Sequence, residues 1–283
     1  MTDILLRSRT LDPATSGTLV EVTPGEAKWE FVHFAVRQIP AGGEWTSETG
    51  SHEACLVLLR GAVRVSWDGG KTSHTLGPRA SVFDAYPHAV YLPPGTAVRV
   101  TADQPSEFAD CRAPSRLTLP PRIVKPEDCG FEIRGGGNAT RQIVDILPPS
   151  FPADRLLICE VYTPAGNWSS YPPHKHDTDN PPVEVDLEET YYFRFRDRAA
   201  YGFQRIYTAD GRVDETLTVR DGDLALIRDG YHPFVTAFGY DAYYLNVLAG
   251  NRRSMAASDD PRYAAFRSNW PAPDPRVPLV GRP

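Results

Sequence analysis

Two histidines separated by one residue, His174 and His176, stand in the stretch SSYPPHKHD. Side chains alternate faces along an extended strand, so the two imidazoles point to the same side and Lys175 points to the other. Two imidazoles about 7 Å apart on one face can share a metal ion. The same pair would also suit a surface position beside a proline-rich loop, so a metal site requires further ligands.

A carboxylate ligand is available at the head of the next predicted strand, where Glu188 and Glu189 are adjacent. Glu189 continues the face of Tyr191 and Phe193, which favours it, although a shift of one residue would select Glu188 instead. A later histidine, His232, follows a glycine turn in DGYHPF. Three nitrogens and one carboxylate suit one divalent ion of Zn, Mn, Fe, Co or Ni, with Zn or Mn favoured.

The composition is that of a globular chain with many turns, since 27 prolines and 22 glycines occur among 283 residues. The net charge of −6 and the lack of a Lys/Arg block argue against nucleic acid and anionic membrane as partners. The first residues have no apolar core long enough for a signal peptide, and no apolar run reaches about 18 residues. We therefore expect a cytoplasmic protein whose four cysteines are reduced.

The elements that position these residues are predicted to be short strands, which recur at intervals of about ten residues as in a sandwich or jelly roll. In the first half they cover 29–39, 54–70 (two strands joined by a tight turn) and 89–102 (a pair around Pro-Pro-Gly). In the second half they cover 141–147, 155–163, 191–195, 203–208, 223–227 and 242–248. The endings of the two halves are weakly similar, which is consistent with a duplicated β-domain.

Two other segments are expected to be different. Residues 112–138 contain four prolines and a glycine triplet, and we interpret them as a linker between a domain at 1–111 and a domain at 139–283. Near the C-terminus, Asp259-Asp260-Pro261 can cap a short helix over RYAAFRSNW, with the proline at its first position.

The order His-x-His, glutamate and late histidine resembles the metal signature of the cupins. More narrowly, four blocks resemble the 5-deoxy-glucuronate isomerases of inositol breakdown, a family related to the 4-deoxy-threo-hexosulose-uronate isomerases of pectin degradation. The blocks lie at 136–149, 164–177, 187–195 and 229–250. This resemblance covers most of the chain and implies an all-β bicupin fold, with two jelly-roll barrels in one chain.

The resemblance also implies that the C-terminal barrel holds the metal, through His174, His176, Glu189 and His232. The gap between His176 and Glu189 is long for a cupin, and we expect this insert to form a lid or rim. The first half has a glutamate at a strand start, Glu53, but no His-x-His before it and no histidine closely after its Pro-Pro-Gly turn. We therefore expect residues 1–111 to be a degenerate cupin whose histidines are structural.

The activity implied by the resemblance is metal-dependent aldose–ketose isomerisation of 5-deoxy-glucuronate to 5-dehydro-2-deoxy-gluconate. A metal with open positions could hold the two oxygens of the reacting carbons. Proton transfer through an enediolate and a direct hydride shift both need this grip, and the sequence does not separate them. A metal-dependent bicupin dioxygenase and a non-catalytic sugar-binding bicupin are the alternative functions.

The expected partner is a small-molecule sugar acid, and a homo-oligomer is left open. Its carboxylate requires a cation, preferably a bidentate arginine, and Arg141 at the start of a strand is our first choice, ahead of Arg205 and Arg228. Tyr231 and Tyr244 are expected to supply further polar contacts at the catalytic site.

Overall fold

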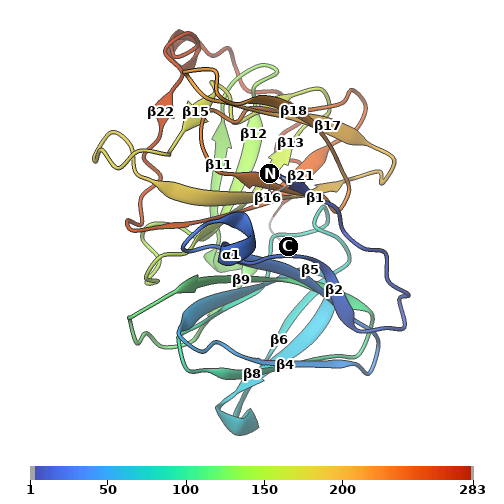
Figure 1. Cartoon of the computed structure of the whole chain (residues 1–283). Coiled ribbons are helices and arrows are strands. Elements are labelled where there is room, and N and C mark those ends of the chain that lie inside the picture. Colours follow the sequence, from blue (N-terminus) through green and yellow to red (C-terminus); the bar gives the residue numbers. More distant parts are fainter. Residues whose placement is uncertain (1–3, 282–283) are drawn as a thin grey trace. The chain divides into compact units, whose positions relative to one another are not determined.

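The computed structural model describes residues 4–281, and almost all of their regular structure is β-strand. The chain forms two compact units (Figure 1). The N-terminal unit comprises residues 8–129, 150–156 and 281, and the C-terminal unit comprises residues 4–7, 130–149 and 157–280. The prediction of an all-β protein is confirmed. Within residues 4–281 no helix combines the length and apolar character that a membrane span requires.

The N-terminal unit is a nine-stranded sheet in the order β10-β7-β5-β9-β3-β2, to which β4, β6 and β8 are joined. Its strands are β2 (Gly17–Val22), β3 (His33–Ile39), β4 (Glu44–Glu48), β5 (His52–Trp67), β6 (Thr72–Arg79), β7 (Ala89–Leu92), β8 (Ala97–Ala102), β9 (Ser106–Pro114) and β10 (Arg122–Val124). Helix α1 (Pro24–Ala27) connects β2 to β3, the 3-10 turn η1 (Asp68–Gly70) connects β5 to β6, and a second 3-10 turn, η2 (Pro126–Asp128), follows β10. Apolar side chains of these strands, among them Leu56, Val65 and Val100, form its core.

The predicted tight turn within residues 54–70 is wrong, because residues 54–67 belong to the continuous strand β5. The glycine that suggested the turn, Gly61, has φ +95°, and a Cβ there would overlap the Ser106 side chain. The ladders on either side of it shift register, so Gly61 bends the strand without ending it. Beyond this bend β5 leaves its pairing with β7 and continues against β6 and β8.

Glu53, at the start of β5, is completely buried within the N-terminal unit. Its carboxylate accepts hydrogen bonds from the backbone N–H groups of Asp154, Arg155 and Leu156 at 2.7, 2.7 and 2.8 Å. The hydroxyl of Tyr91 donates a fourth at 2.9 Å. A carboxylate offers about four acceptor positions, so these donors use its capacity and hold the segment 150–156 against β5.

We expect Glu53→Gln to lower the melting temperature and to leave the metal content unchanged. The amide would turn its NH₂ group toward backbone N–H donors and leave at least one of them buried without an acceptor, which costs about 1–3 kcal/mol. Thermal denaturation followed by circular dichroism measures the loss, with exposed Glu127→Gln as the control. An unchanged melting temperature would contradict the role, and lost metal would place a metal site in this unit.

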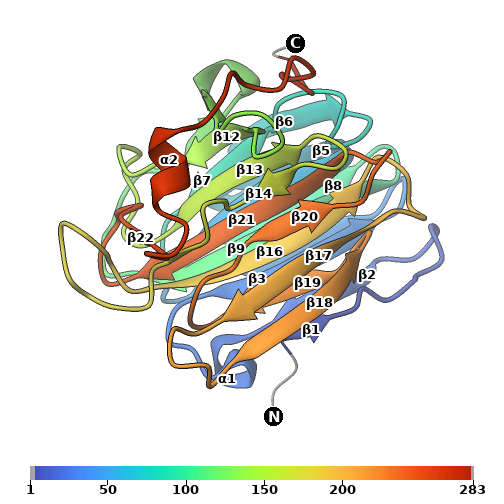
Figure 2. The ribbon, with the colours of Figure 1, turned by 90° about the horizontal axis from the view of Figure 1, so that it is seen from above.

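The C-terminal unit contains a seven-stranded sheet, in the order β1-β19-β16-β21-β13-β12-β11, and a four-stranded sheet, β14-β20-β17-β18 (Figure 2). The strands are β1 (Leu5–Leu6), β11 (Gly130–Arg134), β12 (Arg141–Leu147), β13 (Leu157–Thr163), β14 (Trp168–Ser169), β15 (His174–Lys175), β16 (Leu187–Phe195), β17 (Tyr201–Tyr207), β18 (Asp214–Arg220), β19 (Leu224–Ile227), β20 (Phe234–Thr236), β21 (Ala242–Gly250) and β22 (Ser258–Asp259). Strands β15 and β22 form a separate pair. Val161 and Phe193 from the larger sheet pack in one cluster with Val219 and Phe234 from the smaller, so the two sheets face each other across a core.

Residues 112–138, expected to be a linker, include β10 and β11, which pair in the N-terminal and the C-terminal unit respectively. The predicted C-terminal helix is shorter than expected, since α2 covers only Ala265–Ser268. Asp260 does not cap this helix. Its carboxylate accepts from the Tyr207 hydroxyl at 2.6 Å and from the Arg262 side chain at 2.7 Å, and it starts a turn before α2. The division of roles between residues 1–111 and 139–283 stays a prediction.

Candidate metal centre

The long insert between His176 and Glu189 is a loop whose two ends meet. The N–H of Leu187, at the start of β16, donates to the carbonyl of His176 at 2.9 Å. Within the loop, Glu184 and Asp177 both pair with Lys175, whose side chain points away from the imidazoles on either side of it. The chain therefore returns to its starting point before β16 begins, which brings Glu189 beside His176 despite the separation in sequence.

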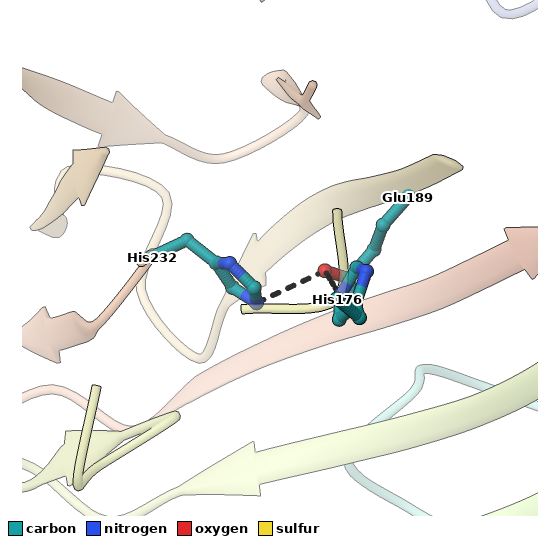
Figure 3. A group of neighbouring side chains, drawn as sticks. All are labelled: His176, Glu189 and His232. Atoms are coloured by element: carbon teal, nitrogen blue, oxygen red, sulfur yellow. Dashed lines mark hydrogen bonds and ion pairs between the residues drawn. The ribbon is translucent and has the colours of Figure 1, made fainter. Parts of the chain in front are cut away.

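His176, Glu189 and His232 converge in the C-terminal unit (Figure 3). Glu189 Oε2 lies 2.9 Å from His176 Nε2 and 3.1 Å from His232 Nε2. Their potential ligand atoms all lie within 4.8 Å of one another, and all three residues are buried. Both imidazoles point at the same carboxylate oxygen, as they would if they surrounded one ion.

Backbone carbonyl groups fix the orientation of these two imidazoles. Nδ1 of His176 lies 3.0 Å from the carbonyl oxygen of Leu187, and Nδ1 of His232 lies 3.0 Å from that of Gly230. A carbonyl only accepts, so each Nδ1 carries a hydrogen, and Nε2 is the ring nitrogen directed to the centre. Outer hydrogen bonds of this kind typically orient histidine ligands in metal sites.

His174 lies beside this group but outside the set of residues whose ligand atoms all lie within 4.8 Å of one another, so its role as a ligand stays a prediction. Its ring centroid lies 4.9 Å from that of His232 and 6.4 Å from that of His176. Burial, and then the neighbouring His232 and His176, lower the pKa of His174 well below its usual value. A neutral imidazole is the form that binds metal, so burial favours the ligand state of this residue.

Glu189 supplies the negative charge of the group. Burial by itself would raise the pKa of this carboxyl, but His176 and His232 lower it well below its usual range. An ionised carboxylate that faces the imidazoles of His176 and His232, with the His174 ring beside them, is a donor set that fits a divalent transition metal.

Beside this group lies a cavity of about 620 Å³ within the C-terminal unit. Apart from His174, His176 and Glu189, its polar wall includes Arg134, Arg141, Asp145, Ser170, Tyr191, Tyr244, Asn246 and Arg267. The volume falls in the range of small-molecule sites, and polar groups that converge in an otherwise apolar wall are typical of them.

Arg141 is buried in this wall, with only 3% of its surface exposed. Its Nη1 donates to the carbonyl oxygens of Tyr171 at 2.9 Å and Ala139 at 3.3 Å. Burial lowers the pKa of Arg141 to about 10, and no carboxylate within residues 4–281 forms an ion pair with it. A buried guanidinium with no anionic neighbour is prepared to receive an anion.

Other arginines of the C-terminal unit are in different situations. Arg134 and Arg267 also line the cavity, but each holds an acidic side chain of its own. Arg205 pairs with an exposed aspartate, and neither it nor Arg228 belongs to the cavity wall. Of the three arginines considered from the sequence, Arg141 lines the cavity beside the metal-binding group, and Arg205 and Arg228 do not.

Tyr244 lies in the cavity wall, within a small network of hydroxyl groups. Its hydroxyl is 2.7 Å from Ser169 Oγ and 3.5 Å from Ser170 Oγ, and Ser170 is 2.9 Å from the Tyr191 hydroxyl. The rings of Tyr191 and Tyr244 stack with centroids 4.3 Å apart. Burial raises the pKa of Tyr244 to about 12, so this side chain acts as a neutral hydrogen-bonding group.

Tyr231, the other tyrosine expected at the site, is not part of the cavity wall. Its ring packs 5.2 Å from that of Tyr207, and its backbone pairs with the same residue. His232, the next residue, points toward Glu189. Neighbouring side chains of extended chain point to opposite sides, which explains why Tyr231 and His232 do not share the site.

Asp145 and Asn246 are among the polar cavity residues that the sequence did not point to. Each is the only strongly polar residue in the middle of an apolar run, RQIVDIL for Asp145 and AYYLNVLAG for Asn246. Asp145 of β12 and Asn246 of β21 are both paired with Cys159 of the strand between them, β13, so their side chains lie on the same inward face. Burial raises the pKa of Asp145. A single polar residue on the inward face of an apolar strand is the signal that could have identified them.

Exchange of each adjacent glutamate for glutamine tests the register of β16. Glu188 is paired with Ala249 and alternates to the face opposite Glu189. We expect Glu189→Gln to lose most of the bound metal, because an amide is a weaker ligand than a carboxylate, and Glu188→Gln to keep it. Elemental analysis of the purified variants gives the ratio of metal to chain. The reverse result would mean that the register is shifted by one residue.

Comparison with known proteins identifies relatives of this chain. The model of the KduI/IolB family matches residues 5–266. The 5-deoxy-glucuronate isomerase of Geobacillus kaustophilus is 45% identical over 250 residues, which cover 88% of this chain and 90% of the relative. The enzyme of the same name from Bacillus subtilis is 42% identical over 245 residues, with 86% and 90% coverage.

Solved structures agree with these relatives. An IolB-like protein from Salmonella typhimurium superposes with a TM-score of 0.89 at 39% identity, and the match covers 93% of this chain and 99% of the other. The oxalate decarboxylase of Lactobacillus farciminis superposes with a TM-score of 0.65 at 11% identity, over 92% and 89% of the two chains. The second likeness concerns the fold alone.

Proposed function

Because the chain belongs to the KduI/IolB family, we propose that it is a metal-dependent 5-deoxy-glucuronate isomerase. It would convert 5-deoxy-glucuronate to 5-dehydro-2-deoxy-gluconate in the breakdown of myo-inositol. The aldehyde of the substrate becomes a hydroxymethyl group, and the neighbouring hydroxyl-bearing carbon becomes a ketone. The curated relatives at 42% and 45% identity carry the name of this activity.

The observation that supports this function best is the presence of two different binding elements in one cavity. His174, His176 and Glu189 lie in its wall and could hold a metal with His232, and the buried Arg141 lies in the same wall without an acidic partner. An open-chain sugar acid has hydroxyl and carbonyl oxygens at one end and a carboxylate at the other. The two elements match the two ends of such a molecule.

The donor set would hold one divalent ion, with Zn²⁺ or Mn²⁺ favoured, and such an ion supplies a Lewis acid for adjacent carbonyl and hydroxyl oxygens. Arg141 binds the substrate carboxylate and fixes the distance from that end to the reacting carbons. Tyr244, neutral because of its raised pKa, contributes a hydrogen bond together with Ser170. The burial of Arg141, Tyr244 and Glu189 keeps bulk water away from the reacting carbons.

Proton NMR of 5-deoxy-glucuronate incubated with the protein tests the proposal. We expect the aldehyde signal to disappear as the ketone forms, and we expect chelator-treated protein to be inactive until Zn²⁺ or Mn²⁺ is restored. Dissolved oxygen, recorded in the same sample, should stay constant. Oxygen consumption would point to a dioxygenase, and an unchanged spectrum with metal-loaded protein would refute the isomerase.

A further inference from the structure

Asn246 connects the Glu189 carboxylate with the cavity. It lies on β21, directly opposite Tyr191 of β16, and Glu189 is two residues from Tyr191 on the same face. The Asn246 side chain is therefore a diagonal neighbour of Glu189 across the two strands. Its Nδ2 donates to Glu189 Oε1 at 2.6 Å.

The two oxygens of Glu189 have separate partners. Oε2 faces the imidazoles of His176 and His232 at 2.9 and 3.1 Å, and Oε1 accepts from Asn246. A carboxylate that rotates freely could present either oxygen, or both, to an ion. The hydrogen bond from the Asn246 amide keeps Oε1 turned away from the imidazoles, so Oε2 is the oxygen that faces the metal-binding group.

This contact also fixes the orientation of the Asn246 amide. An ionised carboxylate only accepts hydrogen bonds, so the NH₂ group must face Glu189 and Oδ1 must face away from it. Oδ1 is buried and has no hydrogen-bond partner within residues 4–281, although the residue lines the cavity. A buried acceptor without a hydrogen bond costs free energy, and a bound ligand removes this cost if it supplies the donor.

We propose that Asn246 is a positioning residue with two contacts: its Nδ2 fixes Glu189 as a one-oxygen ligand, and its Oδ1 accepts a hydrogen bond from a hydroxyl of the bound sugar acid. This inference rests on the proposed function and assigns a specificity to the site. The substrate must present a hydroxyl hydrogen beside the metal-binding group, which selects polyhydroxy acids over acids that lack hydroxyl groups.

Asn246→Leu tests both contacts, because leucine has a similar volume and removes donor and acceptor together. Calorimetric titration of the metal-free protein with Zn²⁺ or Mn²⁺ should show a metal dissociation constant raised about 10- to 100-fold, as is typical when an outer-shell partner is lost. With metal at saturation, the KM for 5-deoxy-glucuronate should rise roughly 2- to 10-fold, the range for one hydrogen bond to a neutral group.

Cys159→Ala is the matched control. Cys159 lies opposite Asn246 on β13 and is equally buried in the cavity wall, but it forms no hydrogen bond to Glu189. Its replacement should leave the metal dissociation constant unchanged. If Asn246 only filled space, the leucine variant would behave like this control.

A leucine variant with the metal affinity of the wild type would overturn the first contact, and one with the KM of the wild type at saturating metal would overturn the second. Asn246→Ala, which adds no larger group, is measured in the same way in case the leucine variant does not fold. The metal titration requires no turnover. A wild-type protein that fails to isomerise the sugar acid therefore refutes the proposed function without deciding the role of Asn246 in metal binding.

Discussion

A protein in which His176 is replaced by alanine is expected to lose its metal ion and its isomerase activity together. His176 Nε2 lies 2.9 Å from Glu189 Oε2, and its orientation is fixed by the Leu187 carbonyl. Without this imidazole the ion would lose a direct ligand. The metal affinity should fall by more than the roughly 10- to 100-fold that outer-shell changes cause. Elemental analysis gives the metal content, and NMR gives the turnover.

Two further variants make this result specific. His88→Ala, in the N-terminal unit, removes a half-buried imidazole outside the metal-binding group and should keep one metal per chain. A double variant of His174 and His176 that still holds one metal per chain would contradict the proposed ligand set. Circular dichroism spectra of all variants separate lost metal from lost fold.

Replacing Arg141 with alanine is expected to weaken substrate binding strongly and to leave the metal in place. The substrate carboxylate would then lie in a buried wall without its cation. Breaking such a pair costs about 2–5 kcal/mol in kcat/KM, most of it through KM. Arg141→Lys should recover only part of this loss, because an ammonium group cannot make the two-pronged contact of a guanidinium. Steady-state kinetics with metal at saturation measures both variants.

Arg205→Ala is the control for this experiment, since Arg205 lies outside the cavity and pairs with Asp214. Its KM should equal that of the wild type. If Arg141→Ala has normal KM and normal turnover, Arg141 is not the carboxylate partner. The assignment would then move to Arg134 or Arg267, which line the same cavity.

Alternation along strands was the most useful guide that the sequence provided. It predicted that His174 and His176 share a face, that Lys175 points away from them and that Glu189 is favoured over Glu188. In the structure Lys175 pairs with Glu184, and Glu189 lies in the group with His176. His174 lies outside that group, and its role as a ligand stays a prediction. The same rule, applied to DGYHPF, would have excluded Tyr231 once His232 was chosen as a ligand. Proximity in sequence was the wrong criterion there, because neighbouring side chains of extended chain diverge.

Other features depend on tertiary contacts that no local pattern contains. The prediction of a turn in 54–70 was wrong because Gly61 forms a bend within one strand, at a close contact with Ser106 of another strand. Whether Arg141 or Arg205 remains without an acidic partner depends on which side chains the sheets bring near, and Asp214 reaches only Arg205. The contact between Asn246 and Glu189 likewise needs the register of β16 against β21, which the sequence of either strand leaves open.

The segment 150–156 belongs to the N-terminal unit although it lies in sequence between β12 and β13 of the C-terminal unit. In the same way β1, near the start of the chain, pairs with β19 of the C-terminal unit. No single cut can therefore release two complete halves, and a fragment that begins after residue 138 would take the hydrogen-bond donors of Glu53 with it.

The same order of segments affects synthesis on the ribosome. The buried carboxylate of Glu53 gains its backbone hydrogen-bond donors only after residue 156 has been made, and β1 can pair only after β19 has been made. The two units are thus interleaved along the chain, and neither can be transplanted into another protein as a contiguous cassette.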